Sequence, residues 1–193
     1  MAPLHNIFAG LGLTVILAAC GGSGLSLSEY GDRLNEIVAT YDPQAEAAWG
    51  EFLQLPEPTL QDVKTLFDRN AAIRTEAEAA FRDLDPPDEI ADLHVLLVDW
   101  LTSLRQAGEA VAARVGTLDS WDEFLQSAEY QTFETTLIGG AEVCNEYQAK
   151  LDATAAGGIF ADTPWIPGDL KEVVEAVVGC DTIPEDLDPA FER

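Results

Sequence analysis

Apolar residues recur every three or four positions through most of this chain, the spacing that places them on one face of an α-helix. The first such stripe begins after Ser26 and Glu29, which have the spacing of an N-terminal capping box. Asp42-Pro43 is expected to interrupt the stripe, since Asp suits a helix cap and Pro suits a first turn. The pattern predicts a kinked pair of helices that ends at Pro56.

A second capping box, Thr59 with Asp62, opens a stripe that should run to about Leu84. The run Asp85-Pro86-Pro87 is expected to end that helix and to start the next one. The following stripe extends from Ile90 to Val115 and predicts the longest helix, which would form the spine of a bundle.

A fourth helix is expected to start at Asp119 or Ser120 and to end at Gly157-Gly158. The helical pattern is weakest in its middle, at Thr135-Thr136 and Gly139-Gly140. Residues 159–168 should form an ordered loop.

Asp169 with Glu172 is expected to cap a short last helix through Val178, and no alternating strand pattern occurs. The sequence therefore predicts an all-α fold, an up-and-down bundle of four main helices plus a short C-terminal helix.

The N-terminal segment has a different character. Residues 7–19 are apolar and uncharged, long enough for an export signal but too short to cross about 30 Å of hydrocarbon. The segment ends in Leu17-Ala18-Ala19-Cys20, where small residues suit a peptidase and a thiol can accept a lipid. This tetrad resembles the lipobox of bacterial lipoproteins. The basic residues expected before such a signal are missing, and the alternative is a buried apolar segment, which Gly21-Gly22-Ser23-Gly24 disfavours.

The resemblance implies cleavage between Ala19 and Cys20, diacylglycerol on the Cys20 sulfur, and a further acyl chain such as palmitate on the new amino group. Residues 1–19 would be the signal peptide, residues 20–27 a lipidated cysteine with a flexible tether, and residues 28–193 a single helical-bundle domain. The implied location is the cell membrane, anchored by lipid on the extracytoplasmic side. Gly21 stands directly after the cysteine, where many lipoproteins kept at the inner membrane have Asp. Location at the outer membrane, if the host has one, is therefore also consistent with the sequence.

The chain carries 35 acidic and 10 basic residues, a formal net charge of −25. Such a surface repels phosphate backbones, which argues against nucleic acid as a partner. Solubility, in a salty habitat for example, explains the acidity, and cation capture is the alternative. The clusters available for a cation, neither with the spacing of a calcium loop, are Asp83, Asp85, Asp88 and Glu89, and Glu185, Asp186 and Asp188.

Two further cysteines, Cys144 and Cys180, would lie outside the reducing cytosol after export, so we predict a disulfide between them. Two cysteines and one histidine offer too few ligands for a zinc site.

His94 is the only histidine after the signal, and it lies on an apolar stripe with no carboxylate one turn away. It is either a core histidine or, less simply, a metal ligand or proton-transfer group. Trp165, in the loop between two prolines, either seals one end of the bundle or contacts a partner.

No catalytic constellation, phosphate loop or cofactor motif is recognisable, so we expect neither enzymatic activity nor a cofactor. Pro86-Pro87-Asp88-Glu89-Ile90, His94 and the two later cysteines are similar to features of small helical exported lipoproteins of unknown function, which implies no activity. The sequence favours a lipid-anchored extracytoplasmic bundle that presents an acidic surface to an envelope protein or a small ligand. The alternatives are a cation- or solute-binding protein using carboxylates with His94, and an enzyme with an unrecognised site.

Overall fold

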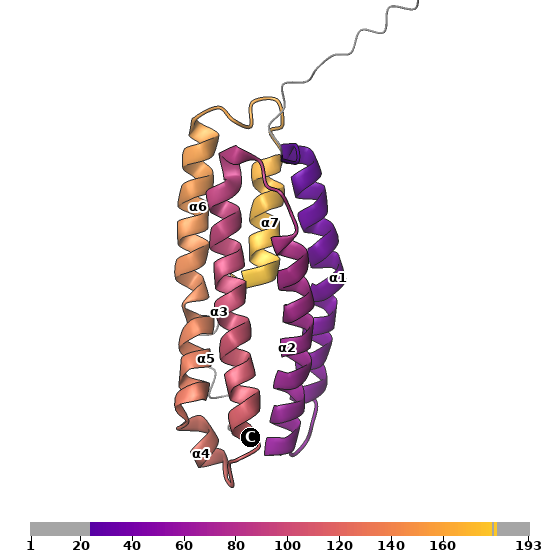
Figure 1. Cartoon of the computed structure of the whole chain (residues 1–193), viewed down its shortest axis with the longest axis vertical. Coiled ribbons are helices and arrows are strands. Elements are labelled where there is room, and N and C mark those ends of the chain that lie inside the picture. The colour runs from indigo at the N-terminus through magenta and orange to yellow at the C-terminus, as the bar shows by residue number, and fades with distance from the viewer. Residues whose placement is uncertain (1–23, 179, 181–193) are drawn as a thin grey trace, which may run out of the picture.

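The computed structural model describes residues 24–178 and residue 180, which form an elongated bundle of helices running up and down along one axis (Figure 1). Cys20 and the rest of the predicted signal and lipidation site lie outside the described residues, as does the acidic cluster at residues 185–188. The described residues contain no strand, which confirms the predicted all-α fold. The helices are α1 (Leu27–Leu53), α2 (Leu60–Arg82), the 3₁₀ turn η1 (Asp88–Ile90), α3 (Ala91–Val115), α4 (Trp121–Leu125), α5 (Ala128–Ile138), α6 (Gly140–Ala156) and α7 (Ile166–Val178).

Helix α1 starts with the predicted capping box. The Glu29 amide donates to Ser26 Oγ over 3.3 Å, and the Ser26 amide donates to Glu29 Oε2 over 3.0 Å. The predicted interruption at Asp42-Pro43 is wrong, because α1 continues through Pro43 as one helix. Proline removes one hydrogen bond to the preceding turn, but buried residues on both sides of it, from Tyr30 to Phe52, hold the helix on a common core.

Helix α2 has the second predicted capping box, formed by Thr59 and Asp62. Pro86 and Pro87 lead into the short turn η1, and only then does α3 begin. At 25 residues α3 is shorter than α1, which has 27, so the prediction that it is the longest helix is wrong. Its role as the spine is confirmed, because α3 packs against α2, α5 and α6.

The predicted fourth helix is divided into α4, α5 and α6, which is a correction. Ser120 caps α4, and Ser127 starts α5 by accepting a hydrogen bond from the Tyr130 amide over 3.3 Å. Ser127 is itself buried, and its hydroxyl donates to the Phe124 carbonyl over 2.7 Å. A side chain that caps a new helix competes with continuation of the old one, and this explains the first break. The second break falls at Gly139, inside the region expected to be weakest.

Helix α7 begins at Ile166 rather than at the predicted cap, Asp169. Pro167 is tolerated in the first turn of a helix, and the Asp169 amide already donates to the Trp165 carbonyl over 3.2 Å. Ile166 is buried, which anchors this earlier start. The helix lies against α1 and α6 (Figure 1).

The segment before α1 is fixed to the folded body. The Leu25 amide donates to the Asp85 carbonyl over 2.9 Å, and the Leu25 side chain packs at the edge of the core. A Cβ atom on Gly24 would lie 2.8 Å from the Pro86 carbonyl oxygen, so this close approach requires glycine. Residues 24–27, expected to belong to a flexible tether, are therefore part of the bundle.

None of the helices within the described part of the chain has the length and apolar composition needed to span a membrane.

Candidate functional site

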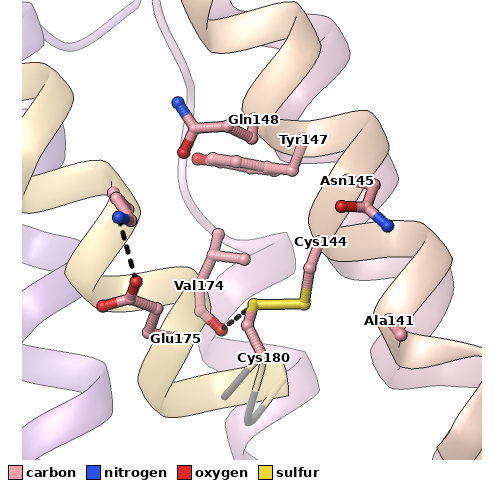
Figure 2. A pocket seen from close by; sticks show the side chains of 9 residues that line it. Ala141, Cys144, Asn145, Tyr147, Gln148, Val174, Glu175 and Cys180 are labelled. Carbon is pink, nitrogen blue, oxygen red and sulfur yellow. Dashed lines mark hydrogen bonds and ion pairs between the residues drawn. A yellow bond between two sulfur atoms is a disulfide. The ribbon is translucent and has the colours of Figure 1, made fainter.

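Cys144 of α6 and Cys180, just after α7, form the predicted disulfide, with their Cα atoms 5.8 Å apart (Figure 2). An open cavity of about 320 Å³ lies beside the bridge, between α6 and α7. Lys171 and Glu175 on its α7 side form an ion pair of 3.4 Å. Burial raises the pKa of Tyr147, on the α6 side, far above its ordinary value, so its hydroxyl stays protonated. Both sulfurs are bonded to each other, and the site offers a structural clamp rather than a thiol nucleophile.

His94, near the start of α3, is held by Tyr30, near the start of α1. The Tyr30 Oη and His94 Nδ1 atoms are 2.9 Å apart, and both side chains are buried. Burial raises the pKa of Tyr30 and lowers the pKa of His94, so a neutral phenol faces a neutral imidazole. This arrangement fits Tyr30 as donor and Nδ1 as acceptor, and it matches the core histidine rather than the ligand.

No group of three or more His, Cys, Asp or Glu residues that could hold a metal ion occurs among residues 24–178 and Cys180. Asp83, Asp85, Asp88 and Glu89 lie in and beside the connection between α2 and α3, where they do not converge into such a group. The cation-binding role considered for these carboxylates with His94 therefore has no support in this part of the chain.

We predict that His94 makes the stability of the protein depend on pH in mildly acidic solution. Burial lowers the pKa of His94 from 6.5 in the folded protein, so the unfolded chain takes up a proton below about pH 6.5 while the folded chain takes it up only at lower pH. Stability is therefore lost as the pH falls below about 6.5, by up to about 1.4 kcal/mol per pH unit.

The check is urea unfolding of the wild type and of His94→Asn between pH 5 and pH 8. Asparagine offers an acceptor near the position of Nδ1 but does not titrate, and the carboxylates titrate equally in both proteins. The free energy of unfolding of the wild type should exceed that of His94→Asn at pH 8, and this difference should become smaller as the pH falls. Parallel curves would show that the histidine proton makes no contribution.

Glu78 of α2 is the centre of a charged network that joins α2 to α3. It is buried, and its carboxylate accepts from Arg105 Nε over 2.6 Å, from Arg82 Nη2 over 2.9 Å and from Thr102 Oγ1 over 3.0 Å. Burial by itself would raise the pKa of Glu78, but the hydrogen bonds from Arg105 and Thr102 lower it. Both carboxylate oxygens of Glu78 accept hydrogen bonds, so this network is a structural cross-link between α2 and α3.

Trp165 is 53 % exposed, and Ile159, in the same connection between α6 and α7, is 41 % exposed. Phe160 in this connection and Ile166 at the start of α7 are both buried, and they close this end of the bundle. Trp165 is therefore more than half exposed while Phe160 and Ile166 are buried, and its role as a partner contact stays a prediction.

Sequence reasoning missed the residue with the most unusual surroundings, Arg74 of α2. It lies near the ring of Phe133, with its guanidinium carbon 6.0 Å from the ring centroid, and it lines a cavity of about 100 Å³. Its pKa is lowered to about 10, because burial disfavours the charged form. A signal for this position was present in the sequence, since Phe67, Arg74 and Phe81 are spaced by seven residues on the apolar stripe of α2.

Comparisons of the chain with protein-family models, with curated proteins and with solved structures found no match.

Proposed function

We propose that this protein is a lipid-anchored, extracytoplasmic helical bundle that presents an acidic surface to an envelope protein or a small ligand without catalysing a reaction. The observation that carries the proposal is the Cys144–Cys180 disulfide, because such bridges persist in oxidising compartments. Export through the lipobox-like segment that ends at Cys20 would bring the chain into such a compartment.

The geometry of one end of the bundle supports attachment there. Gly24 is fixed beside Pro86, and Cys20 precedes it by only four residues, which span at most about 14 Å when extended. The connection between α6 and α7, with the exposed Ile159 and Trp165, lies at the same end of the bundle as the start of α1 (Figure 1). Trp is well suited to the boundary between lipid and water, because its ring is apolar and its N–H is polar. We place this end towards the membrane.

This end also carries Asp85, Asp88 and Glu89, so the lipid would hold the bundle at the membrane against repulsion from anionic headgroups. The acidic surface of the rest of the bundle would face a partner in the aqueous space. Solute binding is the second candidate function, and the cavity beside Arg74 favours it over cation binding.

We expect the wild-type protein to incorporate labelled palmitate and to fractionate with membranes when it is produced in a bacterial host. Cys20→Ser should lose the label completely and remain uncleaved, because it lacks the thiol that receives the lipid. The measurement is autoradiography of fractionated cells together with the mass of the purified protein.

The matched control is the double variant Cys144→Ala, Cys180→Ala, which removes the other two cysteines and should keep the label. An unlabelled wild type, or a wild type found in the cytosol, would overturn the proposal.

A further inference from the structure

We propose that the cavity beside Arg74 is a binding site for a small monocarboxylate with an apolar body, whose carboxylate pairs with the Arg74 guanidinium. The inference deepens the solute-binding form of the proposed function by naming the ligand class. It does not depend on lipidation of Cys20.

The first observation is the lack of a counter-charge. Of the nine Lys and Arg residues in the described part of the chain, Arg74 is the one without an ion pair or hydrogen bond to another described residue. The other eight all pair with acids: Arg33 with Glu36, Lys64 with Asp68, Arg69 with Glu51, Arg82 and Arg105 with Glu78, Arg114 with Glu129, Lys150 with Glu146, and Lys171 with Glu175.

Arg74 forms no ion pair with a described acid, although the chain has 35 acidic residues and a carboxylate partner would be easy to supply. A charge removed from water without a partner is costly, and a face-on aromatic ring compensates only part of that cost. At 6.0 Å, the Phe133 ring is at the outer limit for such a contact. The bundle therefore maintains a partly buried positive charge that an external anion would neutralise.

The second observation is the cavity itself. Its walls come from α1 and α2, with Leu101 of α3 and Val177 of α7 completing it. Most of the lining is apolar, including Ile37, Val38, Ile73 and Phe81. A site with mostly apolar walls, one cation (Arg74) and one acid (Asp42) matches a small amphiphilic monoanion better than it matches inorganic phosphate or a metal ion.

The size and charge of the cavity limit the ligand further. Its volume of about 100 Å³ is smaller than the roughly 150 Å³ of an engineered protein cavity that holds benzene. A short aliphatic body therefore fits inside, and an aromatic ring would extend through the open side of the cavity. Asp42 also lines the cavity, and burial raises its pKa, with the nearby charge of Glu46 adding to the effect. A second negative group on the ligand would meet this carboxylate, and the site should therefore reject dicarboxylates.

The test is calorimetric titration of the purified full-length protein with isobutyrate, benzoate, benzamide and succinate. We expect saturable heat from isobutyrate or benzoate, and affinity lower by about tenfold or more for benzamide, which has the same shape without the charge. Succinate should not bind.

Arg74→Gln should weaken carboxylate binding by about tenfold or more. Arg69→Gln is the matched control, because Arg69 lies on the same helix, pairs with Glu51 at the surface and does not line this cavity. It should leave the affinity unchanged. Ala45→Leu, which narrows the cavity without a change of charge, should also abolish binding.

Thermal unfolding separates a binding role from a structural one. Removing an unpaired, partly buried charge should leave the Tm of Arg74→Gln equal to or above that of the wild type. The inference is overturned if neither carboxylate gives saturable heat with the wild type, if benzamide binds as well as benzoate, or if Arg74→Gln binds as tightly as Arg69→Gln. Because the titration uses purified protein, its failure is distinct from a failure of palmitate labelling.

Discussion

The double variant Cys144→Ala, Cys180→Ala should unfold with a free energy lower than that of the wild type by about 4 kcal/mol. The bridge closes a loop with a sequence separation of 36 residues, and the chain-entropy model gives this value for a loop of that length. For a chain of this size the change corresponds to a fall in Tm of about 8 to 16 °C. Both cysteines are replaced so that no new free thiol remains to form other bridges.

The loss should be greatest in α7. The helix is held by its apolar contacts with α1 and α6, and by the bridge that follows its last turn. Calorimetry without reductant measures the Tm, and hydrogen exchange followed by mass spectrometry locates the change in amide protection.

Reductant provides the control for this prediction. It should lower the Tm of the wild type to that of the double variant and leave the double variant unchanged. A double variant that melts within about 2 °C of the oxidised wild type would contradict the assignment of this stability to the bridge.

Phe133→Ala should destabilise the protein by about 3 to 5 kcal/mol, the range found when a buried aromatic ring is truncated in a packed core. The Phe133 side chain is fully buried, and its ring lies edge-on to Phe67 with the centroids 4.8 Å apart. A Cβ on Gly108 would lie 3.9 Å from the Phe133 ring, which shows how closely α3 approaches α5 here. Since Tyr130 and Phe133 are the buried residues of α5, the attachment of this helix depends on them.

Urea unfolding followed by circular dichroism checks this prediction. Phe133→Leu is the matched control, because leucine retains much of the buried apolar volume, and it should cost less than half as much as alanine. Equal losses for the two variants would mean that ring packing against Phe67 is not the source of the stability.

Local patterns predicted those features that local interactions determine. The capping boxes at Ser26 and Thr59 are found as expected, because their hydrogen bonds span only three residues. The pairing of Cys144 with Cys180 was also predictable, since only these two cysteines remained once Cys20 was assigned to the lipid.

Features that depend on contacts distant in sequence could not be predicted in this way. The sequence predicts a helix break at Pro43, but α1 continues because buried residues before and after Pro43 pack on the same core. Ser127 is an ordinary position in a helical stripe until burial beside Phe124 makes it a cap. The spacing of Phe67, Arg74 and Phe81 places Arg74 on the apolar face of α2, but only the assembled bundle shows that Arg74 forms no ion pair with a described acid.

The fixing of Gly24 beside Pro86 also determines where the remainder of the molecule can go. With the proposed lipid at Cys20, the pivot lies at one tip of a rod, since α1 alone extends about 40 Å at 1.5 Å per residue. The opposite end of the bundle, where α4 and the connection between α1 and α2 lie (Figure 1), would then reach positions up to about 40 Å from the attachment point above the bilayer. Encounters with the cell wall or with a facing membrane would be made by that distant tip.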